Sequence, residues 1–217
     1  MLNVLLRLRQ TLVHYVFERR YNLNTEECEH LEDYGVSGEN GDRVPYVPSG
    51  WLDFGKIAQI AKFSQDDVFV DFGSGKGRMV FLAAARHKFK KVIGVELLNE
   101  WNEIARSNIA NNVKRLKCED VSLVTSDVLA FKIPTDMTVA YFFEPFGTRI
   151  FSAVMKNIQA SIASNPRKLL VIYQSGDRKG RPKLTEVLDQ CDWLKLDCKK
   201  DGKLRGYDFY FYRSLPR

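Results

Sequence analysis

Residues 68–78 read VFVDFGSGKGR, and the expected fold follows from this stretch outwards. Its first half is a short apolar run, which is typical of a strand buried on both faces. Glycines at positions 73, 75 and 77 come next, because a sharp turn that is partly at positive φ needs residues without a Cβ. Residues 79–85 read MVFLAAA and have the apolar spacing of a helix. The stretch predicts a strand, a tight turn and a helix whose first N–H groups face a ligand.

The glycine spacing separates three classes of ligand that use such a turn. A phosphate-binding loop reads G-x-x-x-x-G-K-[ST], but Val70 stands at its first glycine and Gly77 at its hydroxyl. A dinucleotide fingerprint reads G-x-G-x-x-G, and Arg78 stands at its third glycine. Asp71 would also repel a pyrophosphate at close range. The remaining pattern, acid-x-Gly-x-Gly-x-Gly, suits a ligand with a cationic ammonium and sulfonium and no phosphate.

Composition indicates one folded domain of modest basic charge. The 217 residues suffice for one well-buried α/β domain, and 45% of them are hydrophobic. The net charge of +6 tolerates an acidic partner, but no dense Lys/Arg block demands one. The four cysteines form no C-x-x-C pair, and the three histidines show no metal-ligand spacing. No stretch approaches the ~20 apolar residues of a membrane span. We therefore expect no metal, no transmembrane segment and a cytoplasmic location.

The first 50 residues predict an N-terminal extension. Residues 2–20 have the spacing of an amphipathic helix with a basic face. We expect this helix to pack on the domain or on another subunit, and a second interpretation is peripheral contact with a membrane. Residues 21–50 are polar, turn-rich and long enough to predict a lid-like segment.

Acidic residues lie at or just after the ends of two strands predicted after the glycine turn. Residues 91–96 predict a strand that ends in Glu96, where an acid can accept hydrogen bonds from both hydroxyls of a ribose. Residues 120–125 predict the next strand, and Asp127 follows it in the same crevice. Asp127 could accept from an adenine amine, and the alternative is a helix or turn cap.

The remaining chain predicts further alternation of strands and helices. A strand at 138–143 leads into Glu144, Pro145, Phe146 and Gly147. Helices are expected at 51–63, 99–111, 148–164 and 182–190, and strands at 168–173, 193–198 and 207–212. This order predicts a parallel sheet covered on both faces, with an antiparallel last strand.

The order of these features resembles that of the class I S-adenosylmethionine (SAM) dependent methyltransferases. Residues 71–78 and 141–146 also resemble an uncharacterised bacterial subgroup with D-[LF]-G-S-G-K-G-R and [YF]-x-[FY]-[NE]-P-F motifs, as do residues 21–25 and 46–49. The resemblance implies a Rossmann-like, doubly wound α/β fold with a mainly parallel seven-stranded sheet. It also implies an N-terminal helix and lid-like segment at 1–50 and a methyltransferase domain at 51–217.

The resemblance further implies SAM as the cofactor and a set of residues that bind it, namely Asp71, Gly73, Ser74, Gly75, Gly77, Glu96 and Asp127. From their place before the glycine strand, we expect Tyr46 and Trp51 to line or cover the methionine end, with Trp51 equally a candidate for the core. Lys76 and Arg78 are expected at the surface of the helix start. Gln174 and Ser175, after the fifth strand, could face the substrate.

The implied catalytic motif is Glu144, Pro145 and Phe146. Amino-methylating relatives carry [DN]-P-P-[YF], whose first side chain accepts a hydrogen bond from the target amine and aligns its lone pair. This chain has a longer acid and lacks the second proline. Glu144 could act on an amine, serve as general base towards a hydroxyl, or only shape the turn.

The predicted function is transfer of a methyl group from SAM to a nitrogen or oxygen of an unidentified acceptor. A protein lysine or a small molecule is favoured over nucleic acid, because no RNA-binding module or basic-aromatic cluster is appended. The alternative is a SAM-binding regulatory or partner protein without catalytic activity of its own.

Overall fold

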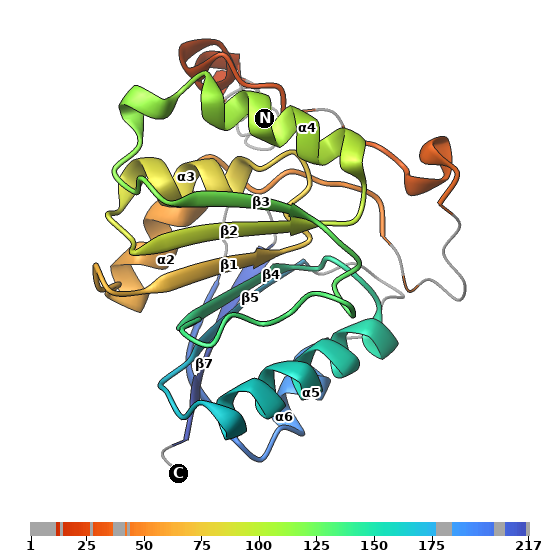
Figure 1. The fold of residues 1–217 in the computed structure, drawn as a ribbon, viewed down its shortest axis with the longest axis vertical. Coiled ribbons are helices and arrows are strands. Elements are labelled where there is room, and N and C mark those ends of the chain that lie inside the picture. Colours follow the sequence, from red (N-terminus) through yellow and green to blue (C-terminus); the bar gives the residue numbers. More distant parts are fainter. Residues whose placement is uncertain are drawn as a thin grey trace, which may run out of the picture.

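In the computed structural model, the chain forms one seven-stranded sheet with helices on both faces (Figure 1). The structure describes residues 12–13, 15–26, 28–36, 42, 44–176, 184–201 and 207–215. The strand order is β3-β2-β1-β4-β5-β7-β6. The strands are Val68–Phe72 (β1), Lys91–Glu96 (β2), Val121–Thr125 (β3), Val139–Phe143 (β4), Leu170–Gly176 (β5), Leu194–Lys200 (β6) and Tyr207–Ser214 (β7).

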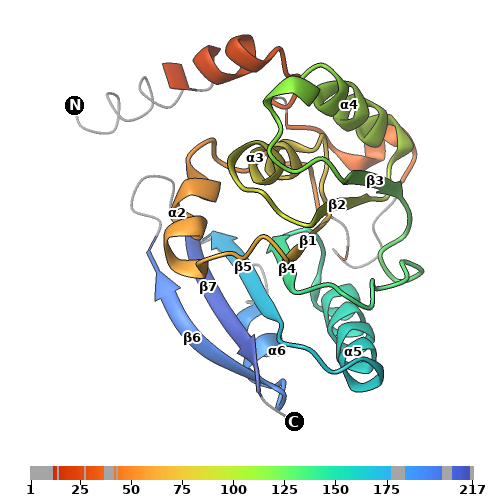
Figure 2. The same ribbon diagram turned by 60° about the vertical axis from the view of Figure 1, so that its left-hand side comes forward.

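Helices cover the two faces of the sheet unequally. The helices are Asp53–Ala61 (α2), Arg78–Arg86 (α3), Asn99–Ala110 (α4), Thr148–Ser164 (α5) and Leu184–Asp189 (α6), with short 3₁₀ turns at Leu31–Tyr34 (η1) and Val113–Arg115 (η3). In Figure 2, α2, α3 and α4 lie on one side of the sheet and α5 and α6 on the other.

Each face of the sheet has its own hydrophobic core, and β1 contributes to both. Val68, Val70 and Phe72 belong to the core under α5 and α6, whereas Phe69 belongs to the core under α2 and α3. This alternation follows from the two-residue period of a strand. All five residues of β1 are buried, as the continuous apolar run predicted.

The topology confirms the predicted fold class. The strands from β3 to β5 are parallel, and β7 is antiparallel to both β5 and β6, so that the last strand lies inside the sheet and β6 forms its edge. The chain runs from β1 outwards to β2 and β3 and then crosses back to β4 on the other side of β1, so the strand order reverses beside β1. Open α/β sheets bind ligands at the carboxyl ends of strands at such a switch point.

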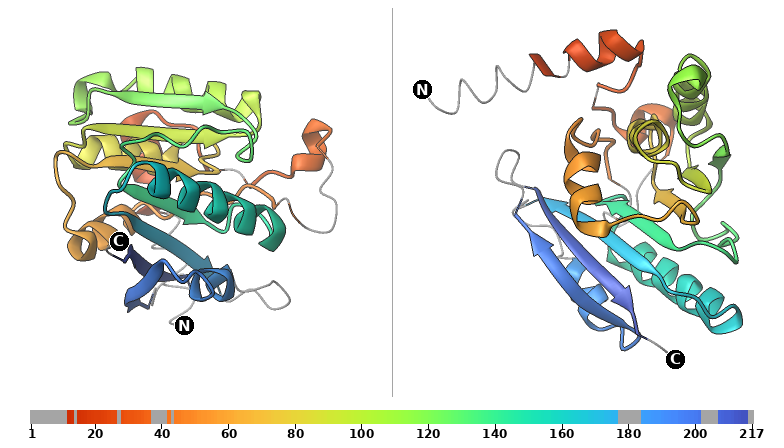
Figure 3. Two further views of the ribbon diagram at one scale, coloured as in Figure 1. Left: turned by 60° about the horizontal axis from the view of Figure 1, so that its bottom comes forward. Right: turned by 90° about the vertical axis from the view of Figure 1, so that its left-hand side faces the viewer.

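The N-terminal helix packs on the domain, as the first interpretation expected. Residues 12–13 and 15–21 are helical, and Val13, Phe17 and Tyr21 pack against the core under α2 and α3. The ring of Phe17 stacks on Trp51 with centroids 5.1 Å apart. Residues 1–11 and 14 of the predicted helix lie outside the described residues. Figure 3 (right) shows the helical segment on the outer side of α3.

Candidate functional site

A cavity lies at the switch point, at the carboxyl ends of the parallel strands. Its walls come from the glycine turn after β1, the ends of β2 and β4, the loop after β3, the start of α5 and the segment before α2. The lining residues include Val44, Pro45, Tyr46, Val47, Pro48, Ser49, Asp71, Gly73, Ser74, Gly75, Met79, Val95, Glu96, Trp101, Ser126, Asp127, Val128, Phe143, Glu144, Pro145, Phe146 and Ile150.

The glycine turn leaves room that side chains would fill. Gly73 has φ 80°, and a Cβ built on it would lie 2.5 Å from the Cβ of Pro145. Gly75 has φ 53°, and a Cβ there would overlap the ring of Tyr46. Both positions therefore need glycine for conformation and for close approach. Gly77 caps the start of α3, and the buried Oγ of Ser74 has no hydrogen-bond partner among the described residues.

Glu96 is held by the backbone around it. Its Oε2 accepts the N–H of Gly75 at 2.8 Å, and its Oε1 accepts the N–H groups of Leu97 at 2.8 Å and Leu98 at 3.1 Å. Burial raises the pKa of Glu96, although these three hydrogen bonds oppose the rise. The contacts fix the carboxylate at the end of β2 and tie it to the glycine turn.

Asp71 lies near Glu96 and is 3% exposed. Burial and the charge of Glu96 raise the pKa of Asp71 well above its usual range. Two buried acids that face one cavity make ionisation costly unless a cation or hydrogen-bond donors arrive. A ligand with a cationic sulfonium and ammonium and with ribose hydroxyls offers both, so the residues present fit SAM.

Asp127 lies at the rim of the cavity. Its side chain is exposed, and Oδ1 accepts the N–H of Leu129 at 2.8 Å. The turn-cap interpretation therefore describes one of its contacts, and Asp127 also lines the cavity.

The motif after β4 forms another wall of the cavity. Glu144 adopts a φ of 40°, which is uncommon for a residue with a side chain and marks strain near functional sites. Its Oε1 accepts a hydrogen bond from Ser175 Oγ at 3.2 Å. Pro145 abuts Gly73, and Phe146 packs against Phe142 at a centroid distance of 6.2 Å.

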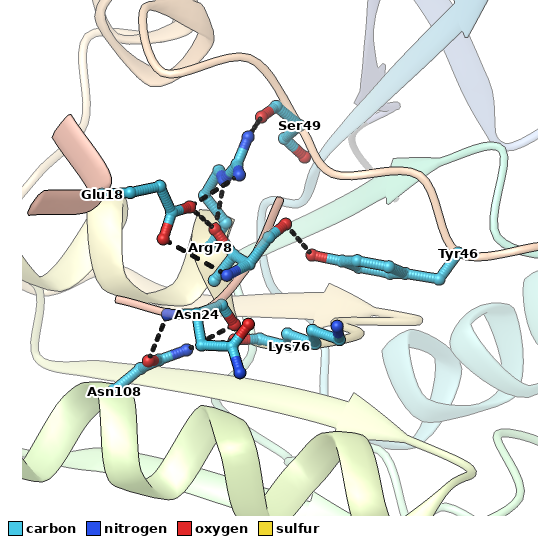
Figure 4. Close-up of polar contacts among 8 residues, drawn as sticks. Glu18, Asn24, Tyr46, Ser49, Lys76, Arg78 and Asn108 are labelled. Atoms are coloured by element: carbon cyan, nitrogen blue, oxygen red, sulfur yellow. Dashed lines mark hydrogen bonds and ion pairs between the residues drawn. The ribbon is translucent and has the colours of Figure 1, made fainter. Parts of the chain in front are cut away.

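The expectation that Arg78 lies at the surface was wrong: it is 2% exposed. Its Nε donates to Thr25 Oγ1 at 2.6 Å, its Nη2 to Glu18 Oε1 at 2.8 Å and its Nη1 to the carbonyl of Ser49 at 2.9 Å (Figure 4). The guanidinium also lies over Trp51, 4.7 Å from the ring centroid. Arg78 thus joins the N-terminal helix and the segment before α2 to the glycine turn.

The same expectation was wrong for Lys76, which is 1% exposed. Its ammonium pairs with the carboxylate of Glu29, which also accepts from Trp101 Nε1 at 2.7 Å. Burial alone would raise the pKa of Glu29, but the hydrogen bonds from Lys76, Tyr34 and Trp101 outweigh it and lower the pKa. Both cations of the glycine turn are therefore satisfied by acids from the N-terminal segment.

Tyr46 and Trp51 occupy different places. Tyr46 lines the cavity, and its hydroxyl donates to the carbonyl of Thr25 at 2.9 Å (Figure 4). Trp51 is 1% exposed and lies in the core, so its second interpretation holds. Gln174 lies within β5, because that strand continues to Gly176. Its side chain is buried, accepts a hydrogen bond from the Tyr141 hydroxyl and donates one to Asp53.

Sequence reasoning missed the acids that hold the two cations. Glu18 and Glu29 lie 60 and 47 residues before their partners, and no local spacing links them. One signal was available: Arg78 directly precedes the apolar run MVFLAAA, and a charge beside such a run needs a partner when the helix is buried.

Over the described part of the chain, no group of three or more His, Cys, Asp or Glu side chains is placed to hold a metal ion. None of the helices within that part is both long and apolar enough to cross a bilayer.

Comparison of sequences finds two partial matches. A family model described as "Histone methylation protein DOT1" matches residues 52–127, which include Asp71, Glu96 and Asp127 but end before Glu144. A protein-lysine N-methyltransferase of Saccharolobus islandicus is 42% identical over 69 residues. That match covers 32% of this chain and 43% of the relative, and so less than half of either protein.

Solved methyltransferase structures share the architecture of the chain at low identity. A putative tRNA methyltransferase of Streptococcus pneumoniae in complex with S-adenosyl-L-methionine has a TM-score of 0.54 at 18% identity, with 75% of this chain and 73% of that chain covered. The putative methyltransferase yhhF of Escherichia coli has a TM-score of 0.56 at 15% identity, with 84% and 92% covered. A SAM-dependent methyltransferase of Clostridium acetobutylicum has a TM-score of 0.54 at 15% identity, with 77% and 91% covered. The fold of this chain is that of the class I SAM-dependent methyltransferases.

Proposed function

We propose that this chain is an enzyme that transfers a methyl group from SAM to a nitrogen, with the side chain of a protein lysine as the acceptor. The observation that carries the proposal is the meeting of Asp71, Glu96, Asp127 and Glu144 at one cavity beside the glycine turn. These four residues come from the ends of three strands and one loop of the switch point. This placement supports a site for a cationic nucleoside rather than a core packing arrangement.

The proposed binding residues contact different parts of the cofactor. Glu96 accepts from the ribose hydroxyls, Asp127 accepts from the adenine amine, and Asp71 lies towards the charged end. Gly73, Ser74, Gly75 and Gly77 let the backbone approach the ligand, and Tyr46 covers the methionine end. In this proposal the described part of residues 1–50 supplies a lid-like wall, while residues 51–217 form the catalytic domain.

The chemistry asks little acid–base help of the protein. SAM supplies a methyl group on a sulfonium whose leaving group is a neutral thioether. The acceptor reacts as the neutral amine, so the lysine ammonium first loses one proton to solvent. Glu144 accepts a hydrogen bond from this amine and orients its lone pair, while Pro145 and Phe146 shape that wall. Most of the rate then comes from alignment and from exclusion of water by Tyr46 and the segment before it.

Two partial matches support lysine as the acceptor. The matching relative is a protein-lysine N-methyltransferase, and the matching family model concerns histone methylation. The model ends at residue 127, so the acceptor wall with Glu144 lies beyond it. An oxygen or a small-molecule acceptor is the second candidate, because Glu144 also suits a general base towards a hydroxyl. We propose the cytoplasm as the location.

Incubation with labelled SAM tests the proposal. A lysine-rich peptide and its counterpart with arginine at every lysine serve as acceptors, and we expect label only on the lysine peptide. Glu144→Gln should lower turnover about tenfold to a thousandfold and leave SAM affinity within about twofold, because the residue acts on the acceptor. The matched control is Glu100→Gln, an exposed acid at the start of α4.

Two results would contradict the proposal in different ways. Label on both peptides or on neither, with SAM bound, would remove lysine as the acceptor. SAM binding without label on any peptide, small amine or hydroxyl compound would favour the alternative, a SAM-binding regulatory protein without activity of its own.

A further inference from the structure

The N-terminal helix presents apolar residues to solvent as well as to the core. Val13, Phe17 and Tyr21 face the domain. On the other side, Leu12 is 62% exposed, Tyr15 56% and Val16 47%. Isolated exposed apolar residues are ordinary, but three on one short helix make a face that invites a partner.

Two exposed arginines follow these apolar residues towards the end of the helix. Arg19 and Arg20 are exposed on the same helix, and Arg19 Nη1 donates to the hydroxyl of Tyr15 at 2.6 Å. The acid of the described helix, Glu18, turns inward onto Arg78, so its charge is neutralised away from the face. The first 17 residues contain no Asp or Glu.

A second basic element lies beside the helix. Arg115 lies over the ring of Tyr21, 5.2 Å from its centroid, and Asn112 Nδ2 donates to the carbonyl of Tyr21 at 2.7 Å. These contacts hold η3 next to the helix. Within η3, Val113 is 62% exposed, and Lys114 and Arg115 are exposed too. The turn therefore repeats the combination of an exposed aliphatic side chain with cations.

We propose that this basic-apolar face, made of Leu12, Tyr15, Val16, Arg19 and Arg20 with η3 at its flank, docks the protein on an anionic phospholipid surface. Cations alone would serve nucleic acid equally well, but nucleic acid offers no place for exposed leucine and valine. A lipid interface accepts both, since aliphatic and tyrosine side chains enter the boundary layer while arginines contact headgroup phosphates. The helix lies in the plane of the surface and does not span it.

The geometry also explains how such docking would hold the whole domain. Glu18 joins the helix to Arg78, and Phe17 stacks on Trp51, so the helix is part of the folded body. A membrane that binds the outer face thereby holds the domain at its surface. This inference goes beyond the proposed methyl transfer and is independent of it, because binding is measured without SAM.

Co-sedimentation of the full chain with vesicles tests the proposal. We expect binding to vesicles of phosphatidylcholine with phosphatidylglycerol and none to phosphatidylcholine alone. Arg19→Gln/Arg20→Gln should weaken partitioning about thirtyfold, given the contribution of each cation near an anionic surface. Leu12→Ser/Val16→Ser should weaken it about tenfold or more.

The matched control variants substitute exposed cations and exposed leucines that lie outside the basic-apolar face. Lys156→Gln/Lys168→Gln removes two exposed cations, one on α5 and one just before β5, and Leu129→Ser/Leu196→Ser removes two leucines that are 39% and 44% exposed. Both should bind as wild type does, and circular dichroism should show all variants folded. The proposal is overturned if wild type fails to bind anionic vesicles, if Leu12→Ser/Val16→Ser binds unchanged, or if the controls lose binding equally. It is also overturned if the face binds duplex DNA or RNA and not vesicles.

Discussion

Arg78 shows how one buried side chain holds the glycine turn to the N-terminal segment. We expect Arg78→Met to lower the free energy of unfolding by about 3 kcal/mol or more, because it leaves the Glu18 carboxylate without its cation. Arg106→Met is the control, since its pair with Glu103 has side chains 39% and 61% exposed and should contribute about 1 kcal/mol or less. Urea unfolding measures both. Equal losses in the two variants would contradict a special role for the buried pair.

The contribution of Asp71 to the free energy of unfolding depends on pH. Burial and Glu96 raise its pKa in the folded protein, so stability from this group is fully present below about pH 4 and is lost as pH rises through the raised pKa. Asp71→Asn imitates the protonated form. Its unfolding midpoint should therefore exceed that of wild type by more at pH 8 than at pH 5, while its SAM affinity falls. Thermal scans at the two pH values test this, with the exposed Asp192→Asn as control. A gain that is equal at both values would refute the assignment.

Alanine variants of Gly75 and Gly35 distinguish the effect of a steric clash from the effect of backbone strain. A Cβ at Gly75 would overlap the ring of Tyr46, whereas a Cβ at Gly35, with φ 71°, would meet nothing within 4 Å. Both alanine variants are strained by about 1–2 kcal/mol. We expect SAM binding to be lost in Gly75→Ala and kept in Gly35→Ala, as measured by calorimetry. Retained affinity in Gly75→Ala would mean that the wall formed by Tyr46 can move freely.

At the scale of elements, the N-terminal helix has one side that packs on the domain and one side that faces solvent. We expect Phe17→Ala to lower the free energy of unfolding by about 1–3 kcal/mol, because its ring packs on Trp51 in the core. Leu12→Ala, at 62% exposure, should change it by about 0.5 kcal/mol or less. Denaturant midpoints compare the two. A larger loss of unfolding free energy in Leu12→Ala than in Phe17→Ala would mean that the side of the helix with Leu12, and not the side with Phe17, packs on the domain.

Elements with local signals could be predicted from the sequence. The bounds of β2 and α5 agree with the expected 91–96 and 148–164. Both elements could be predicted because the strand period, the helix period and the flanking turn residues are signals within a short stretch of sequence. The end of β5 was placed too early. Gln174 and Ser175 are polar, yet they pair with Phe209 and Asp208 of β7, a partner strand that becomes visible only in the assembled sheet.

At the scale of the whole molecule, the sheet order brings together residues that the sequence keeps apart. Asp71, Glu96 and Glu144 were expected at one edge because parallel strands end there, and the structure places all three at one cavity. The burial of Lys76 and Arg78 could not be predicted in the same way. Their partners, Glu29 and Glu18, lie in the N-terminal segment before the first strand, and the approach of this segment to the glycine turn depends on tertiary packing rather than on any repeat.

The central claim is that this cavity binds SAM through the acid at the end of β2, and calorimetric titration of SAM into wild type and Glu96→Ala tests it most directly. We expect binding in wild type, about a hundredfold loss in Glu96→Ala because charge-assisted hydrogen bonds to the ribose disappear, and wild-type affinity in the exposed control Glu100→Ala. Absence of binding in wild type, or equal affinity in wild type and Glu96→Ala, would contradict the account.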